Sequence, residues 1–311
     1  MKNARSTRIA VAVFSTTLFF SCSSAPKAPP IVLETRNQAA QFVQLGAKAL
    51  RDSAVASART FYAEAYRLYT ATDDAEGRIR ALDGLGRLPE ADTAELWRNA
   101  ARVADDSGDQ KLVALAGLLD AELKLWSGDE SDARKALVQA RASAKILSDQ
   151  PKDRSRALRV AAAAAKATLD YPTALALLDE AAGIDLKERA FVEYASDRYL
   201  AASIHSKAGN YAEARAALMD ALDSDRRAEN AAGIGGDYFA LALVAEKSGD
   251  AATAAGYFAR AADVFRAARL EEKAADAEAR RDASLALLPM DTEEREAAER
   301  KGTPQEFTQG D

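Results

Sequence analysis

The sequence predicts an all-α solenoid of about six helical hairpins, followed by a capping helix. Six alanines recur 36, 39, 41, 40 and 40 residues apart, at Ala58, Ala94, Ala133, Ala174, Ala214 and Ala254. A second alanine follows seven residues after each of them. A fixed period near forty residues is typical of stacked helical hairpins. Composition agrees, because alanine dominates the 48% hydrophobic fraction and β-branched residues form no alternating runs.

The first element is a predicted secretion signal over residues 1–21. Lys2, Arg5 and Arg8 make a basic start, and an apolar stretch of 12 residues follows over 9–20. That stretch is long enough for the hydrophobic part of a signal peptide and short for a bilayer span.

Cys22, the chain's one cysteine, comes directly after this segment and is preceded by the small residue Ser21. The arrangement resembles a bacterial lipoprotein signal, which implies a diacylglycerol-modified Cys22. Leu18 lies four residues before the cysteine, where such signals usually place leucine three before. Two alternatives stay open: ordinary cleavage near Ser23 or Ala25, giving a soluble secreted protein, or an uncleaved anchor. Residues 22–35, rich in proline and small residues, are expected to form a flexible tether.

The solenoid is expected over residues 36–288, and a polar, acidic and disordered tail over 289–311. In each hairpin an alanine permits two helices to approach closely, and a large side chain one turn later fills the adjoining groove. Gly128, Gly209 and Gly249 each precede an anchor alanine by five residues and are expected to end the first helix of the pair in the left-handed conformation. We expect six units, at about 36–72, 73–107, 108–148, 151–186, 190–230 and 231–269, with a capping helix over 270–288.

The repeats resemble the tetratricopeptide repeat (TPR), in its longer variant of roughly forty residues. The second-helix pattern is clearest over residues 207–214 with Leu218 and Ala221, and the first-helix pattern at Phe42 and Gly46. In the second unit Arg98 stands where a core residue is expected, and the adjacent Trp97 is a candidate substitute.

The resemblance implies a right-handed superhelix whose first helices line a concave channel that holds a peptide or a partner helix. A basic middle and an apolar C-terminal end would suit a ligand with both acidic and hydrophobic character. Carried over by position, the expected lining is Val43, Leu50, Arg156, Arg159, Lys166, Ser196, Tyr199, Ser203, Lys207, Phe239, Leu243 and Lys247.

Signals for catalysis, metal or cofactor binding are weak, so we expect none of the three. His205 is the one histidine, and we interpret it as a packed core residue. We interpret residues 233–236, Gly-Ile-Gly-Gly, as a loop between repeats rather than a phosphate cradle. Trp97 and Trp126 are expected in the core, and two glycines of the second unit, at 84 and 86, are expected at close contacts. A net charge of −6 disfavours nucleic-acid binding.

The resulting hypothesis is a non-catalytic, lipid-anchored TPR scaffold that binds a protein or peptide partner in the cell envelope. Ser23 after the cysteine is compatible with a place in the outer membrane, facing the periplasm. The alternative is a small-molecule or lipid-binding accessory lipoprotein of a transporter, suggested by the run of alanines over 161–165. The sequence does not predict an oligomeric state.

Overall fold

The computed structural model describes residues 33–288, which contain thirteen α-helices and no strand. Helices α1 to α13 therefore account for the whole described solenoid. Cys22, the signal segment, most of the tether and the tail after residue 288 lie outside the described residues. The helices are α1 (Glu34–Arg51), α2 (Val55–Ala71), α3 (Ala75–Gly86), α4 (Thr93–Ser107), α5 (Gln110–Trp126), α6 (Glu130–Ile146), α7 (Pro151–Ala167), α8 (Tyr171–Glu188), α9 (Phe191–Lys207), α10 (Tyr211–Arg227), α11 (Ala231–Lys247), α12 (Ala251–Ala267) and α13 (Glu271–Ala286).

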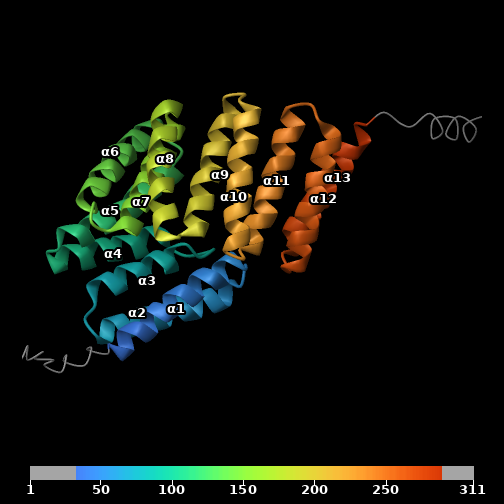
Figure 1. Cartoon of the computed structure of the whole chain (residues 1–311). Coiled ribbons are helices and arrows are strands. Elements are labelled where there is room, and N and C mark those ends of the chain that lie inside the picture. Colours follow the sequence, from blue (N-terminus) through green and yellow to red (C-terminus); the bar gives the residue numbers. More distant parts are fainter. Residues whose placement is uncertain (1–32, 289–311) are drawn as a thin grey trace, which may run out of the picture. The chain divides into compact units, whose positions relative to one another are not determined.

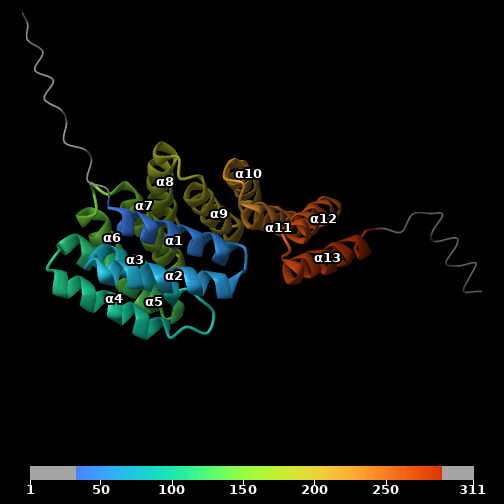
Figure 2. The ribbon, with the colours of Figure 1, turned by 90° about the horizontal axis from the view of Figure 1, so that it is seen from below.

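Every helix packs against its neighbours in chain order, as the colours of Figures 1 and 2 show. The odd-numbered helices from α1 to α11 also contact one another from one unit to the next. Paired helices thus form hairpins, and the hairpins stack through their first helices. The predicted all-α solenoid of six hairpins and a terminal helix is confirmed. Within the described residues no helix is long and apolar enough to cross a membrane.

The alanine period marks helix crossings, as expected. Ala58, Ala174, Ala214 and Ala254 have no exposed surface, and Ala133 is 3% exposed. The small methyl group of alanine lets the helices approach closely at these crossings.

The second unit departs from the expected register by one residue. Ala94 is only half-buried and Arg98 is exposed, whereas Trp97 is 3% exposed and Ala100 is fully buried. Thr93 therefore occupies the anchor position, and its hydroxyl donates a hydrogen bond of 2.7 Å to the carbonyl of Gly86. The physical reason is that α4 turns the charged Arg98 to solvent and buries the indole beside it.

Three predicted turn glycines have the expected left-handed backbone. Their φ angles are 72° at Gly128, 81° at Gly209 and 83° at Gly249. The fourth unit places Leu169 at the same position with φ 62°, although a side chain disfavours that conformation. The turn geometry is therefore a property of the hairpin, and glycine is the residue that adopts it with least strain.

The glycine-rich segment at 233–236 is not a loop, so that prediction is wrong. It forms part of the first two turns of α11. A Cβ atom on Gly233 would lie 2.0 Å from a carboxylate oxygen of Asp225, and one on Gly235 would lie 2.4 Å from the Phe265 ring. The glycines let α11 approach α10 and α12 closely. The close contacts expected at Gly84 and Gly86 are confirmed, against Tyr62 and Trp97 respectively.

Candidate functional site

Side chains from the odd-numbered helices line two hollows on one face of the solenoid, here called the inner face. The larger, about 580 Å³, is named the tryptophan hollow and lies across α3, α5, α7 and α9. The smaller, about 140 Å³, is named the lysine hollow and lies mainly between α9 and α11. The tryptophan hollow is lined by Asp83, Arg87, Glu122, Leu125, Trp126, Arg156, Arg159, Val160, Ala163 and Leu200. The lysine hollow is lined by Tyr199, Ala202, Ser203, Ser206, Lys207, Leu218, Ala240, Leu243, Val244 and Lys247.

Trp126 is not a core residue, contrary to expectation. Its side chain is 57% exposed and faces the larger hollow, whereas Trp97 is buried as predicted. The two rings lie 5.1 Å apart between centroids. An exposed indole held from behind by a buried one is a rigid apolar contact surface, of the kind that dominates binding energy at protein interfaces.

Arg156 lies at the inner face, but acidic side chains already compensate its charge. Its guanidinium donates to Asp83 at 2.6 Å and to Glu122 at 2.8 Å. Arg87 pairs with the same two carboxylates. Burial alone would raise the pKa of Asp83, but the charges of Arg156 and Arg87 outweigh it and lower that pKa. The site is therefore a neutral cluster of two arginines and two carboxylates.

Arg159 is compensated in the same way, by a pair of buried carboxyl groups. It donates to Asp185 at 2.6 Å and to Asp197 at 2.5 Å, and the Ser155 hydroxyl also donates to Asp185. Burial raises the pKa of Asp197 to about 7, and the Arg159 charge opposes that rise. The expected basic middle of the channel is thus internally neutralised.

The carboxyl pair recurs forty residues later without its arginine. Asp225 and Asp237 stand forty residues after Asp185 and Asp197, and Tyr199 stands where Arg159 would be expected. Asp225 accepts a hydrogen bond of 2.9 Å from the Asn230 side chain. Burial, and then the neighbouring Asp225 carboxylate, raise the pKa of Asp237 to about 8. This second pair therefore holds a proton at neutral pH.

The cationic groups around the lysine hollow have polar rather than acidic partners among residues 33–288. Lys166 donates to the Ser203 hydroxyl at 2.8 Å, and Lys247 donates to the Ser206 hydroxyl at 3.2 Å. Burial and then the charge of Lys207 lower the pKa of Lys166. The structure therefore brings together Lys166, Ser203, Lys207 and Lys247 of the expected lining, with Tyr199 and Leu243 at the same hollow.

Other expected lining residues lie apart from the two hollows. Ser196 is exposed, and its hydroxyl donates to the carbonyl of Val192 in its own helix. Phe239 is half-buried, packs edge-on against Phe258, and lies under the guanidinium of Arg280. Two residues of the first unit, at 43 and 50, are half-buried against the α1–α2 core.

Several lining residues were missed, although the repeat register contains a signal for two of them. Trp126 lies two residues before the turn glycine Gly128, as Lys207 does before Gly209. Glu122 lies six residues before Gly128, as Ser203 does before Gly209. Extending the expected lining to the third unit would have found both. Asp83 and Arg87 carry no such signal, because the second unit lacks the turn glycine.

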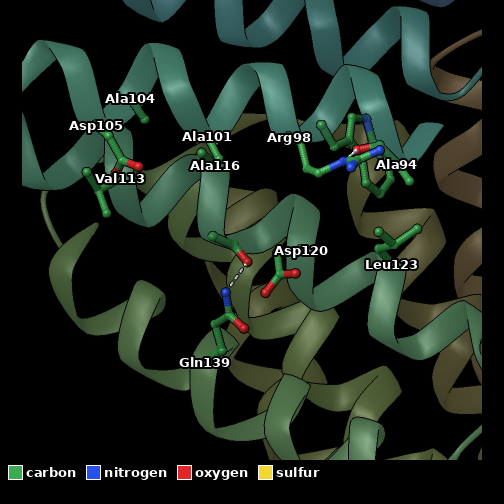
Figure 3. A pocket seen from close by; sticks show the side chains of 12 residues that line it. Ala94, Arg98, Ala101, Ala104, Asp105, Val113, Ala116, Asp120, Leu123 and Gln139 are labelled. Carbon is green, nitrogen blue, oxygen red and sulfur yellow. Dashed lines mark hydrogen bonds between the residues drawn. The ribbon is translucent and has the colours of Figure 1, made fainter. Parts of the chain in front are cut away.

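A third hollow, of about 260 Å³, lies between α4, α5 and α6 (Figure 3). Its walls include Ala94, Ala101 and Ala116, and the Gln139 side chain donates to the carbonyl of Gly117 at 2.8 Å. The register change in α4 explains this space, because small side chains face α5 where a large one would fill it.

The described part of the chain holds no metal site. No cluster of three or more His, Cys, Asp or Glu side chains there could hold a metal ion. His205 is half-buried, and its Nδ1 atom has no hydrogen-bond partner among those residues.

Comparison with known proteins supports the fold. No family model matches the chain, and no curated protein matches its sequence. Among solved structures it is similar to apo RapI, with 9% identity and a TM-score of 0.56, covering 80% of this chain and 72% of that one. It is also similar to a Rap protein complexed with Competence and Sporulation Factor, with 15% identity and a TM-score of 0.53, covering 81% and 77%. Rap proteins are TPR-like helical repeat proteins, so these similarities agree with the TPR-type fold.

Proposed function

We propose that this protein is a non-catalytic scaffold that binds an extended peptide, or a helical segment of a partner protein, along its inner face. The observation that carries this proposal is the tryptophan hollow, where a half-exposed indole stands beside apolar and charged side chains from four helices. A structural neighbour was solved in complex with Competence and Sporulation Factor, which supports a binding role for this fold. Because packed helices hold the surface in place, little ordering is needed on binding.

The test begins with selection of peptides from a random display library against the full chain purified in mild detergent. Selected peptides are then titrated against the Trp126→Ala variant. We expect a loss of about tenfold or more, the usual effect of removing an aromatic anchor. Val138→Ala is the matched control, because Val138 is 71% exposed on the second helix of its hairpin. Equal binding by both variants would show that the peptides bind elsewhere.

We further propose that a lipid on Cys22 anchors the mature chain in the cell envelope. The proposed location is the outer membrane, on the side that faces the periplasm. Support comes from the basic start, the 12-residue apolar stretch and the single cysteine directly after it. A lipid would raise the effective concentration of the scaffold for partners at the same membrane. Cys22→Ala should abolish incorporation of labelled palmitate and release the protein from membranes; unchanged labelling would exclude the anchor.

A small-molecule or lipid carrier is the second candidate. It is favoured by the volume of the tryptophan hollow, about 580 Å³, which lies within the range of small-ligand pockets. Of the alanine run that suggests a carrier, Ala163 lines this hollow, whereas Ala161, Ala162, Ala164 and Ala165 are fully buried. Native mass spectrometry of the purified chain distinguishes the candidates, since a carrier retains a bound small molecule of defined mass.

A further inference from the structure

Lys207 and Lys247 line the lysine hollow, and Lys166 reaches it by donating to the Ser203 hydroxyl; unlike the inner-face arginines, these lysines have no acidic partner among residues 33–288. Within residues 33–288, no carboxylate oxygen forms a salt bridge with Lys166, Lys207 or Lys247. Lys166 and Lys247 instead donate to serine hydroxyls. Arg156 and Arg159 each contact two carboxylates. The hollow therefore combines several positive charges with two hydroxyl groups.

Helix ends explain only part of this arrangement. Each lysine lies in the last turn of its helix, α7, α9 or α11, where the helix dipole favours a cation. The dipole supplies about half a negative charge per helix end, so roughly half of each lysine's charge stays uncompensated. The three ammonium groups together therefore attract an anion, and the hydroxyl groups beside them can donate to it.

The chain leaves its last described helix beside this hollow. Ser284, near the end of α13, donates to a carboxylate oxygen of Glu246 at 3.0 Å, and Glu246 directly precedes Lys247. The Arg280 guanidinium of α13 also lies over the Phe239 ring of α11. The ends of α13 and α11 thus lie at the same edge of the solenoid, and residue 289 follows from that edge.

The segment that follows has the complementary charge. Residues 291–299 hold five carboxylates, at Asp291, Glu293, Glu294, Glu296 and Glu299, against one arginine. Lys207, on α9, lies about two helix spacings from α13, or roughly 20 Å. Six extended residues after Leu288 reach about 20 Å, so the acidic segment is long enough to reach the hollow.

We propose that the lysine hollow is a carboxylate-binding site whose occupant is the chain's own acidic C-terminal segment, residues 291–299. Its carboxylates would pair with Lys207 and Lys247, in the last turns of α9 and α11. This inference does not depend on the proposed peptide-binding function, because the contact is made within one chain.

The experiment measures proximity in the full chain. A zero-length carbodiimide reagent joins lysines to carboxylates in contact, and tryptic peptides of the monomer are identified by mass spectrometry. We expect links from Lys207 and Lys247 to Glu293, Glu294 or Glu296, and their loss in 0.5 M salt, where charges are screened within about 4 Å. Lys187 is the control, an exposed lysine near the end of α8. Links at Lys187 equal to those at Lys207, or links between isotope-labelled and unlabelled chains, would overturn the proposal.

A second measurement guards against low reagent yield. The full-length variant Glu293→Gln/Glu294→Gln/Glu296→Gln keeps every described residue. The short connection to α13 holds the acidic segment at a millimolar effective concentration near the lysine hollow, so the segment protects the lysines only in part. Removing its charges should therefore raise amine labelling of Lys207 and Lys247 about two- to threefold. Labelling of Lys187 should not change. If the hollow lysines stay protected in this variant, the occupant is an acidic partner or an anionic lipid, and the proposal is wrong.

Discussion

The buried pair Asp225 and Asp237 predicts an unusual dependence of stability on pH. Asp237 is 2% exposed, and its pKa is raised from 3.8 to about 8 by burial and by the neighbouring Asp225 carboxylate. The folded state thus binds a proton that the unfolded state releases above about pH 4. The stabilising effect of that proton is complete below pH 4, decreases as the pH rises, and is lost near pH 8.

The size of the effect follows from the shift. A shift of about four pKa units, at 1.36 kcal/mol each, lowers the free energy of unfolding by on the order of 5 kcal/mol between pH 4 and pH 8. This figure is an upper limit for the pair. Burial raises the pKa of Asp225 as well, and the hydrogen bond from Asn230 and, more weakly, the charge of Arg51 oppose that rise.

The Asp237→Asn variant tests this reasoning, because asparagine resembles the protonated acid at every pH. Urea unfolding followed by circular dichroism at pH 5, 7 and 9 should give near wild-type stability at pH 5. At pH 9 the variant should be more stable than wild type by a few kcal/mol. Asp223→Asn, an exposed position on α10, the helix that carries Asp225, should keep the wild-type dependence of the free energy of unfolding on pH. If Asp237→Asn keeps the wild-type dependence of the free energy of unfolding on pH, or is less stable than wild type at pH 9, Asp225 and Asp237 do not share a proton.

Further predictions concern the packing and turns of the repeats, and each is read as the urea midpoint by circular dichroism. Leu169→Gly should stabilise the protein by about 0.5–1 kcal/mol. The change removes left-handed backbone strain of about 1–2 kcal/mol, and the entropy that glycine adds to the unfolded chain offsets only part of this gain. No gain in stability would mean that the turn is unstrained. Ala214→Phe should destabilise by roughly 1–3 kcal/mol through overpacking of a fully buried crossing, and a neutral result would contradict the assigned register. Gly84→Ala should be destabilising, because its Cβ atom would lie 2.2 Å from the Tyr62 ring. Gly183→Ala is its matched control, with open space around a helical glycine, and should stabilise by about 0.5–1 kcal/mol.

The fold could be predicted from the sequence because its determinants are local. A crossing needs an alanine, a turn needs a residue that tolerates positive φ, and both recur at one spacing. Ala214 and Gly209 illustrate this, since their roles follow from their positions within a single repeat. The exception is the second unit, where Trp97 and Arg98 compete for one core position. Burial of the indole and exposure of the guanidinium decide the register there, and the alanine spacing alone gives the wrong answer.

The charges of the site could not be predicted, because their partners come from other repeats. Arg156 contacts Asp83, 73 residues earlier in the chain, and Arg80 contacts Asp153 across the same separation. These pairs join α3 to α7, two units apart. They depend on how strongly successive hairpins curve toward one another, which a repeat pattern does not specify. At the lysine hollow the expected lining residues Ser203, Lys207 and Lys247 lie together, and no acidic partner from another repeat compensates the two lysines among the described residues.

The difference between arginine and lysine divides the inner face into two kinds of surface. A ligand that recruited Arg156 or Arg159 would have to displace a carboxylate partner, and an uncompensated buried carboxylate is costly. In the proposed function, recognition at the tryptophan hollow therefore relies on Trp126 and its apolar neighbours, with the ion pairs holding the helices in position. Lys207 and Lys247 form no salt bridge with a carboxylate among residues 33–288. Their charges can therefore contribute directly to binding at the lysine hollow. A partner that uses the whole inner face would then have an apolar part at α5 and an acidic part at α9 and α11, and that acidic part would compete with the C-terminal segment for the same lysines.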